Sequence, residues 1–380
     1  MMLAQLARYD ARLQQLAQKD RGRQLSARTG VDFSSNDYLG LASCPRLAAG
    51  AMSALERGVP LGAGGSRLLR GNHEEHEALE TEAAAFFGGE RALYFGNGYA
   101  ANLAVLSTLP LRGDLVLHDA LIHASAHAGI KAGRAEAVAV RHNDVEACEE
   151  AIRHWRQNGG LGTPWIAVES LYSMDGDHAP LQDLMSVADR HDGFLFVDEA
   201  HASGVWGPDG RGFAADLEGR ENVLVLHTCG KALGMSGAFV AGSAVLLDYL
   251  VNHAKPFIYS TAPSPLQAAS LREVLRILRD EPERRWRLHH LVHLADGLST
   301  DLLGTSSGSQ IQPVVVGSNG RAIRLAERLR RDGFDVRAIR PPTVPAGTAR
   351  LRISITCNVE EQDVRSLFDH LAVALMEISS

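Results

Sequence analysis

Residues 194–201 read Phe-Leu-Phe-Val-Asp-Glu-Ala-His, an apolar run that ends in two carboxylates and a histidine. Successive apolar residues are typical of a strand covered on both faces, as in a parallel sheet. Ligands of such sheets bind beyond the carboxyl ends of the strands, so Asp198, Glu199 and His201 stand where function is expected. On this segment alone, a structural Asp–His pair or a metal site is an equal alternative. A Walker B strand also ends in Asp-Glu, but the chain has no GxxxxGK[ST] loop, so nucleotide hydrolysis is poorly supported.

A second apolar run, residues 223–228, leads into Cys-Gly-Lys-Ala-Leu-Gly. This short turn contains one lysine, Lys231. Most lysines are solvated, but one boxed by glycines directly after an apolar strand is expected to be partly buried. Desolvation lowers the pKa of a lysine and makes its amine a usable nucleophile or Schiff-base former. Together, Asp198 and Lys231 indicate a pyridoxal 5'-phosphate (PLP) enzyme, in which a carboxylate holds the protonated pyridine nitrogen and a lysine carries the cofactor.

Such an enzyme also needs a phosphate-binding turn. Residues 95–102 (FGNGYAAN) supply a strand end, a glycine turn and a helix start. The free N–H groups and the dipole of a helix start suit an anion. Glycine turns are common in α/β folds, so this motif is weak by itself.

The chain repeats the alternation of strand and helix, which predicts a mainly parallel sheet in an α/β domain. One predicted helix is capped by Asn72, with Glu75 completing a capping box. Its inner face is expected to carry Leu79, Ala83, Phe86 and Phe87. The predicted strands of the sheet are residues 92–95, 115–119, 137–140, 165–170, 194–200, 223–228 and 238–243.

After about residue 275 the pattern changes to that of a smaller α+β domain. The predicted elements are a helix at 283–294, a strand at 311–316, a helix at 321–331, strands at 335–340 and 351–356, and a last helix that carries Val364, Leu367, Phe368, Leu371 and Leu375. The predicted domains are therefore an N-terminal helical or extended segment (1–40), a PLP-binding α/β domain (41–270) and a C-terminal α+β domain (271–380).

The composition is that of an ordinary globular protein, with 380 residues, 45% hydrophobic residues and a formal net charge of -7. The mild acidity favours neither a nucleic-acid nor a membrane partner. No apolar stretch approaches the ~20 residues of a transmembrane helix, and the N-terminus lacks the apolar core of a signal peptide. The scattered Cys44, Cys148, Cys229 and Cys357 predict reduced thiols in the cytoplasm. Cysteines and histidines show no metal-ligand spacing, so no metal is expected.

Taken together, these motifs resemble the α-oxoamine synthase family of fold-type I PLP enzymes, in the family's order from about residue 33 to residue 356. The resemblance implies an aspartate-aminotransferase-like fold and a homodimer with a shared active site. The matching segments are 33–40 (FSSNDYLG), 62–71, 98–102, 123–125 (HAS), 173–176 (SMDG), 198–201, 228–231, 259–261 (YST) and 340–352.

The resemblance implies the following cofactor roles. Lys231 carries PLP and then acts as the general base, while Asp198 pairs with the pyridine nitrogen. His201 hydrogen-bonds the phenolic oxygen, and His123 stacks on the ring and assists catalysis, with a capping or core histidine as its alternative. The other implied contacts to cofactor or phosphate are Gly98, Tyr99, Ser173, Thr228 and, contributed by a partner subunit, Thr261. The turn 173–177 is equally explained by plain turn chemistry.

For the substrate carboxylate the resemblance points to Arg352, with Asn36 nearby, because a planar guanidinium binds a carboxylate through two bonds. Arg350 lies two residues away on the same face of a strand and stays an alternative. Arg340 is implied as a mobile second arginine, and Thr343 as a substrate contact in the loop 340–347. The segment before Asn36 diverges from the family pattern. The family's N-terminal substrate arginine is assigned to Arg21, with Arg23 as the alternative.

The implied reaction is the condensation of an amino acid with an acyl thioester. Residues 36–40 and 340–352 are closest to the member that joins L-alanine to pimeloyl-CoA or a pimeloyl carrier protein in biotin biosynthesis. The sister activities remain alternatives: 2-amino-3-ketobutyrate CoA ligase, 5-aminolevulinate synthase and serine palmitoyltransferase. One departure from the family is Ala-Leu-Gly after Lys231, where Gly-Phe-Gly is frequent. A non-catalytic descendant is expected to lose Lys231 or Asp198, and both are present.

Overall fold

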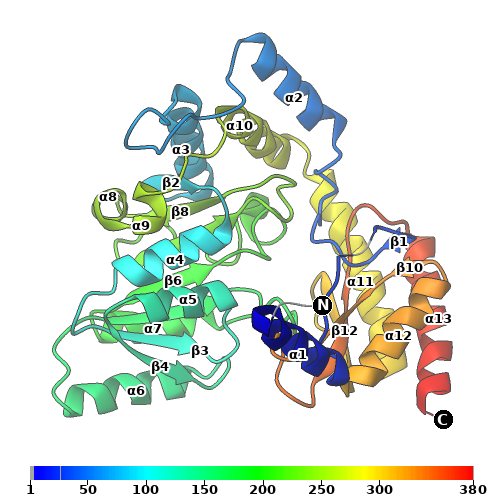
Figure 1. Ribbon diagram of the computed structural model, residues 1–380. Coiled ribbons are helices and arrows are strands. Elements are labelled where there is room, and N and C mark those ends of the chain that lie inside the picture. The colour runs from blue at the N-terminus through cyan, green and yellow to red at the C-terminus, as the bar shows by residue number, and fades with distance from the viewer. Residues whose placement is uncertain (1–3, 26, 380) are drawn as a thin grey trace. The chain divides into compact units, whose positions relative to one another are not determined.

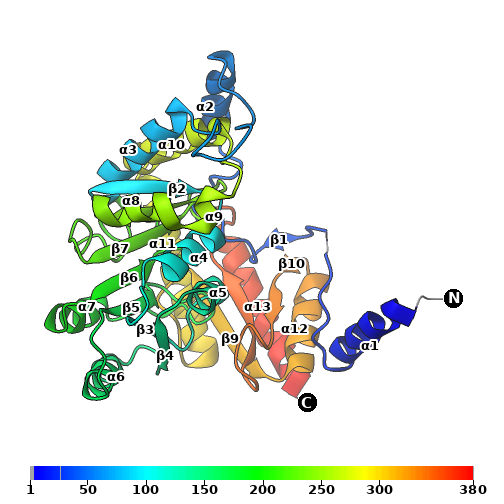
Figure 2. The same ribbon diagram turned by 60° about the vertical axis from the view of Figure 1, so that its left-hand side comes forward.

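The computed structural model describes residues 4–25 and 27–379 and divides into two compact units. The larger unit consists of Leu39–Ser173 and Asp177–Trp286. The smaller unit consists of Met1–Tyr38, Met174–Gly176 and Arg287–Ser380. Figures 1 and 2 label the elements of both units.

The larger unit is built on a seven-stranded sheet with the order β2-β8-β7-β6-β5-β3-β4. Strands β3 to β7 pair in parallel, and β8 runs antiparallel to both of its neighbours, so the predicted mainly parallel α/β sheet is confirmed. The strands are β2 (Arg91–Phe95), β3 (Leu115–Asp119), β4 (Glu136–Val140), β5 (Pro164–Glu169), β6 (Phe194–Asp198), β7 (Val223–Thr228) and β8 (Ala238–Gly242).

Helices cover both faces of this sheet, which explains why the strands are apolar at successive positions. Phe196 packs in the core below α4 and α5, whereas its neighbours Leu195 and Val197 pack in the core on the other face, below α6 and α7. Figure 2 shows these two pairs of helices on opposite sides of the strands. The helices are α2 (Pro45–Glu56), α3 (Glu74–Phe87), α4 (Gly98–Thr108), α5 (Ala124–Ala132), α6 (Val145–Gln157), α7 (Leu181–Arg190), α8 (Ala244–His253), α9 (Lys255–Ile258) and α10 (Pro265–Asp280), with a 3-10 turn, η1, at Pro208–Gly210.

The start of α3 corrects the predicted capping box. The N-cap is His73, because its Nδ1 accepts a hydrogen bond from Glu75 N at 3.2 Å and its own N–H donates to His76 Nδ1 at 3.2 Å. An imidazole nitrogen thus does what the Asn72 amide was expected to do, while Asn72 binds Arg67 and Glu77 instead. On the inner face Leu79, Ala83 and Phe87 are buried as predicted, but Phe86 is only half-buried.

The smaller unit contains a three-stranded antiparallel sheet with the order β11-β12-β9 and a short parallel pair, β1 with β10. The predicted strand 335–340 is therefore divided, because Asp335 pairs with Asp32 of β1 whereas Arg337 pairs with Arg352 of β12. The elements are α1 (Ala4–Gln18), β1 (Val31–Asp32), β9 (Ile311–Gly317), α12 (Asn319–Arg331), β10 (Phe334–Asp335), β11 (Arg337–Ile339), β12 (Ala349–Ser354) and α13 (Glu361–Ser379). Helix α11 (Glu283–Leu303) is longer than the predicted 283–294.

Among the described residues, no helix is both long and apolar enough to cross a membrane. Within the same residues, no group of three or more histidine, cysteine or acidic side chains is arranged to hold a metal ion. All four cysteines are free thiols, of which Cys44, Cys148 and Cys229 are buried.

Candidate active site

The carboxyl ends of β5, β6 and β7 direct three polar side chains to one face of the sheet. Side chains alternate along a strand, so Glu169, Asp198 and Thr228 follow Ala167, Phe196 and Leu226 onto the face that α4 and α5 cover. Glu199 takes the opposite face, where it accepts hydrogen bonds from Ser170 Oγ at 2.8 Å and Ala214 N at 2.5 Å. The alternation therefore separates the two adjacent carboxylates of the segment 194–201.

Asp198 is buried, with 4% of its surface exposed, and it lies within a small network of polar side chains. Its Oδ2 accepts a hydrogen bond from Asn102 Nδ2 at 2.7 Å, and its Oδ1 accepts one from Ala200 N at 3.0 Å. Asn102 also donates to Ser125 Oγ at 2.9 Å, and that hydroxyl bonds His123 Nδ1 at 2.7 Å. Donors aimed at a carboxylate stabilise its charged form.

His123 serves as the N-cap of α5, because its Nδ1 accepts from Ser125 N at 3.3 Å. The capping role, which is the alternative that the sequence leaves for His123, is therefore present. The hydrogen bonds to Nδ1 fix the orientation of the imidazole ring. Burial lowers the pKa of His123, the charge of Asp198 raises it, and the charge of Lys231 lowers it again. The net lowering favours a neutral imidazole near neutral pH.

Lys231 lies in a turn that backbone hydrogen bonds close at both ends. Cys229 N donates to Gly237 O at 2.9 Å, and Met235 N donates to Cys229 O at 2.8 Å. Gly234 has a φ of +66°, and a Cβ there would come within 2.6 Å of Leu41, so this position requires glycine. Lys231 itself is half-buried, as its position between glycines predicts.

The glycine turn before α4 packs directly on the end of β7. A Cβ built on Gly98 would lie 2.6 Å from the Thr228 methyl carbon Cγ2, so only glycine lets the two segments approach this closely. Asn97 caps α4 by accepting a hydrogen bond from Ala100 N at 2.8 Å. The first turn of α4 therefore lies beside Thr228. The other N–H groups of this turn would stabilise an anion there.

The other predicted cofactor residues occupy different surroundings. His201 is buried just after β6, and Ser173 is half-buried in the loop after β5, where its N–H donates to Glu169 Oε2 at 3.3 Å. Tyr99 and Thr261 are exposed. The loop of Thr261 is joined to the glycine-rich segment 62–71 by a hydrogen bond from Ala262 N to Gly65 O at 2.8 Å.

All the predicted substrate residues lie in the smaller unit. Arg352 donates to Asn36 Oδ1 at 2.9 Å, to Tyr38 Oη at 3.1 Å and to Ser354 Oγ at 3.0 Å. Arg350 forms an ion pair with the Asp175 carboxylate and also donates to Met174 O at 3.2 Å. The two arginines that the sequence left unresolved therefore have different partners.

The N-terminal segment at residues 20–23 and the loop 340–347 contact each other within the smaller unit. Arg340 donates to the carbonyl oxygens of Asp20 at 2.6 Å and Gly22 at 3.2 Å. Arg23 donates to Thr343 Oγ1 at 3.3 Å, and Arg21 Nε is buried without a hydrogen-bond partner among the described residues. Arg23, the alternative to Arg21, is thus the N-terminal arginine that reaches the loop of Thr343.

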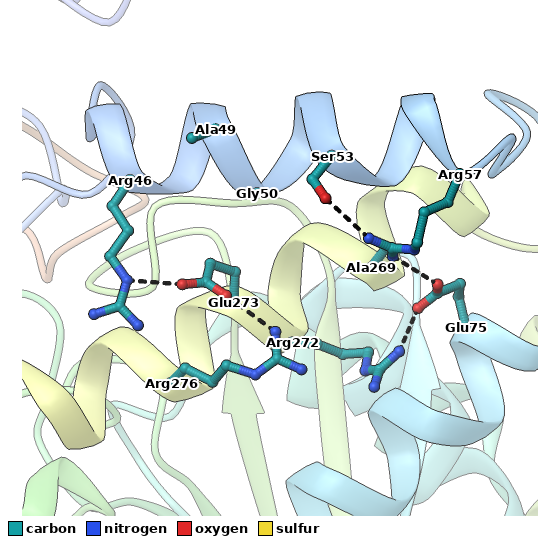
Figure 3. A pocket seen from close by; sticks show the side chains of 10 residues that line it. All are labelled: Arg46, Ala49, Gly50, Ser53, Arg57, Glu75, Ala269, Arg272, Glu273 and Arg276. Atoms are coloured by element: carbon teal, nitrogen blue, oxygen red, sulfur yellow. Dashed lines mark hydrogen bonds and ion pairs between the residues drawn. The ribbon is translucent and has the colours of Figure 1, made fainter.

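A pocket of about 480 Å³ between α2 and α10 contains none of the predicted site residues (Figure 3). Its arginines already have acidic partners: Arg46 pairs with Glu273, Arg57 with Glu75, Arg272 with Glu75, and Arg276 with Glu273. These ion pairs connect α2, α3 and α10. The acidic partners neutralise the arginines that line the pocket. The charged lining of the pocket is therefore explained by a structural network of ion pairs.

Three side chains of the network were not singled out by the sequence. Asn102 and Ser125 link His123 to Asp198, and Glu169 is the Cα partner of Asp198 in the neighbouring strand. Asn102 and Ser125 stand inside the family segments, and Glu169 ends an apolar run. Their polar character at a strand end or helix start was the available signal, but nothing local showed what they face.

Comparisons with known proteins identify the family of the chain. Residues 28–371 match the family model of class I and II aminotransferases. The chain is 45% identical over 351 residues to the 8-amino-7-oxononanoate synthase of Chromobacterium violaceum, covering 91% of this chain and 89% of that protein. It is 42% identical over 360 residues to the enzyme of the same name from Anaeromyxobacter dehalogenans, covering 93% and 89%.

Solved structures give the same fold. The serine palmitoyltransferase of S. paucimobilis with a bound PLP–myriocin aldimine has a TM-score of 0.88 at 28% identity, covering 100% of this chain and 99% of that chain. The 8-amino-7-oxononanoate synthase of Francisella tularensis has a TM-score of 0.76 at 27% identity, covering 92% and 98%.

The fold and the family match define a fold-type I PLP enzyme. The chain belongs to the class I and II aminotransferase family and, within it, to the α-oxoamine synthases, which are PLP-dependent acyltransferases.

The residues present fit PLP. A carboxylate stabilised by two donors stands on the face of the sheet covered by α4, where it can hold a pyridinium nitrogen. The close approach of Gly98 to Thr228 places the first turn of α4 beside the end of β7. The N–H groups of such a helix start can bind a phosphate. The charges of Asp198 and Lys231 both act on His123 and on Glu169. This mutual influence indicates that the four side chains lie close together at one end of the sheet.

Proposed function

We propose that the chain condenses L-alanine with a pimeloyl thioester, either pimeloyl-CoA or a pimeloyl carrier protein, to give 8-amino-7-oxononanoate for biotin biosynthesis. In this reaction the α-carbon of alanine bonds to the acyl carbon while the thioester C–S bond breaks. The alanine carboxyl group leaves as carbon dioxide, and the thiol of CoA or of the carrier is released. The observation that carries the proposal is the 45% identity to the Chromobacterium violaceum enzyme over 91% of the chain.

PLP, when bound, withdraws electrons from the α-carbon of the amino acid. Lys231 holds the cofactor and afterwards takes and returns the α-proton. Asp198, stabilised by Asn102 and the Ala200 N–H, keeps the pyridine nitrogen protonated. His123, fixed through Nδ1, covers the ring and assists the departure of the thiol.

The remaining cofactor contacts are proposed from the family. His201 binds the phenolic oxygen of the cofactor. Gly98, Tyr99, Ser173 and Thr228 hold the cofactor or its phosphate.

Arg352, rather than Arg350, is proposed to bind the substrate carboxylate. Arg350 is already paired with Asp175, so a substrate would have to displace a carboxylate from it. Arg352 donates to the Asn36 amide oxygen and to the hydroxyl groups of Tyr38 and Ser354, and Asn36 orients its guanidinium. Arg340, Thr343 and Arg21 complete the proposed substrate contacts.

A homodimer is part of the proposal. The glycine-rich segment 62–71 and the loop 259–261 are tied together and expose large apolar side chains, with Leu69 at 82% and Tyr259 at 79% exposure. Exposed apolar groups of this size in neighbouring loops mark an interface. A second copy of the chain covers them in the proposed assembly, and Thr261 then completes the phosphate site of the partner.

A sister activity is the second candidate, because serine palmitoyltransferase structures superpose on the chain with a TM-score of 0.88. The test is an absorbance titration of the purified protein with PLP, then with L-alanine, glycine or L-serine, and then with pimeloyl-CoA or palmitoyl-CoA. A band perturbed by L-alanine, and CoA release with pimeloyl-CoA, support the proposal. A preference for glycine or serine moves the chain to a sister activity, and the absence of a cofactor band contradicts PLP binding.

A further inference from the structure

Glu169 is a buried acidic residue at the end of β5 that the proposed reaction leaves without a role. In the register of the parallel pair, Glu169 is the Cα partner of Asp198. Both follow residues that face α4 and α5, so the two carboxyl groups project from neighbouring strands to the same side of the sheet. Strands of a sheet are about 4.8 Å apart, so the two groups interact strongly.

The surroundings of Glu169 are poor in donors. Only 2% of its surface is exposed, and Oε2 accepts a long hydrogen bond from Ser173 N at 3.3 Å. Oε1 is buried and has no hydrogen-bond partner within the described part of the chain. An ionised carboxylate in this position would leave an oxygen with negative charge unsolvated, which is costly, whereas a protonated oxygen can donate a hydrogen bond to a ligand.

Two buried carboxyl groups this close do not both ionise readily, and the one with better donors keeps the charge. Asp198 receives hydrogen bonds at 2.7 and 3.0 Å, whereas the hydrogen bond from Ser173 N to Glu169 is longer, at 3.3 Å. Burial and the charge of Asp198 raise the pKa of Glu169 to about 8, and Lys231 and nearby backbone N–H groups oppose the shift only in part.

The other titratable groups around Glu169 do not reverse this balance. His123 carries little charge near neutral pH, because burial lowers its pKa. Burial also raises the pKa of Tyr172, whose electrostatic neighbours include Glu169 and Asp119. Asp119, at the end of β3, is paired with His142 at 2.8 Å. The charge of Lys231 acts on Glu169, and in the proposed function Lys231 is bonded to the cofactor.

We propose that Glu169 and Asp198 share the site as an acid and a carboxylate, with Glu169 holding the proton, so that its O–H donates a hydrogen bond to the bound ligand and leaves one negative charge for the pyridine nitrogen. This inference rests on PLP binding at the site, but not on which amino acid or thioester the enzyme uses. Glu169 is therefore assigned a positioning and electrostatic role that the sequence motifs do not contain.

The direct test is infrared difference spectroscopy of the carboxylic-acid C=O stretch at pH 6 and pH 7, on the protein with and without PLP. The variant Glu169→Gln keeps the shape of a protonated glutamic acid and removes its band. Glu199 is also buried, and burial raises its pKa to about 7, so the subtraction of variant from wild type is needed to isolate Glu169. The exposed Glu150→Gln is the matched control and should remove no acid band.

The second measurement is the dissociation constant of PLP between pH 6 and pH 9.5. With the proton of Glu169 required for binding, the wild type should lose affinity relative to Glu169→Gln above about pH 8, by up to about tenfold per pH unit. Below pH 7 the two proteins should bind PLP within about threefold of each other, since the amide imitates the acid.

Two results would overturn the proposal: an acid band that Glu169→Gln does not remove, or a loss of PLP binding in this variant at every pH. Should that variant fail to fold, Asp198→Asn decides, because removing the neighbouring charge must lower the pH at which the acid band of Glu169 is lost, although burial still favours the acid. An acid band lost at the same pH as in the wild type would contradict the pairing. Failure of the alanine condensation with these results intact would refute the proposed substrates alone.

Discussion

Nε2 of His142 lies 2.7 Å from Oδ2 of Asp177, and this contact ties the residue after β4 to the loop after β5. The other ring nitrogen, Nδ1, lies 2.8 Å from Oδ1 of Asp119. Asn143 Nδ2 supports the arrangement by donating to Asp177 at 2.8 Å. Burial lowers the pKa of His142, but the hydrogen bonds and charges of the two carboxylates outweigh it and raise the pKa to about 10. The imidazole is therefore a cation between two anions at neutral pH.

Replacing His142 with glutamine should lower the free energy of unfolding by about 2 kcal/mol at pH 6, because Asp119 is buried whereas His142 and Asp177 are partly exposed. Because the folded pKa is raised to about 10, the stabilisation is complete below the unfolded pKa of about 6.5 and is lost as the pH rises through about 10. Urea unfolding at pH 6 and pH 10 measures both. The exposed His293→Gln should change neither value by more than about 0.5 kcal/mol. An equal loss at both pH values would show that the charge of His142 is irrelevant.

Replacing Lys231 with alanine should remove both the visible band of the bound cofactor and all turnover. The reason is that this variant lacks the amine that binds PLP covalently and the base that moves the α-proton. Absorbance spectra and a CoA-release assay provide the measurement. Lys131→Ala, at the exposed end of α5, is the control and should keep both. Multiple turnovers by the Lys231 variant would contradict the assignment.

Replacing Gly98 with alanine should weaken PLP binding by about tenfold or more, because the added Cβ would lie 2.6 Å from Thr228 Cγ2 and push the first turn of α4 away. Gly96→Ala is a matched control two residues earlier, where a Cβ meets no atom within 4 Å. Fluorescence titration with PLP measures both. Thr228→Ser in the Gly98→Ala background removes the methyl group and should restore part of the affinity. A loss that is equal in both single variants would point to the turn and not to this contact.

Arg350 and Arg352 should give different phenotypes although they share one face of β12. Arg352→Ala should raise the KM for the amino acid by roughly 100-fold, the loss expected for a charge-assisted pair with a carboxylate. Arg350→Ala should mainly lower stability, because it leaves Asp175 without its buried partner, whose side chain is 5% exposed. Steady-state kinetics and thermal unfolding of both variants separate the two effects. The reverse pattern would assign the substrate carboxylate to Arg350.

The amino-acid order alone was sufficient for the framework of the larger unit. Successive apolar residues in 194–197 and 223–226 require cover on both faces, and the alternation with helices then favours a parallel sheet. Because parallel strands end at one edge, the same pattern predicts that Asp198 and Lys231 lie at a common edge. The predicted cap of α3 is wrong by one residue. The prediction assigns the cap to Asn72 with Glu75, whereas the acceptor is a ring nitrogen of His73.

What the chain order could not decide is which distant groups meet. Glu169 and Asp198 are brought together by the strand register, and Asn102, Ser125 and His123 join them from two helix starts. Arg350 is distinguished from Arg352 by its partners, among them Asp175, which lies 175 positions away. Periodicity reports which side of an element is buried, because burial depends on the residue and its immediate neighbours. The charge and hydrogen-bond partners of a buried polar group depend on which strands the tertiary structure sets side by side.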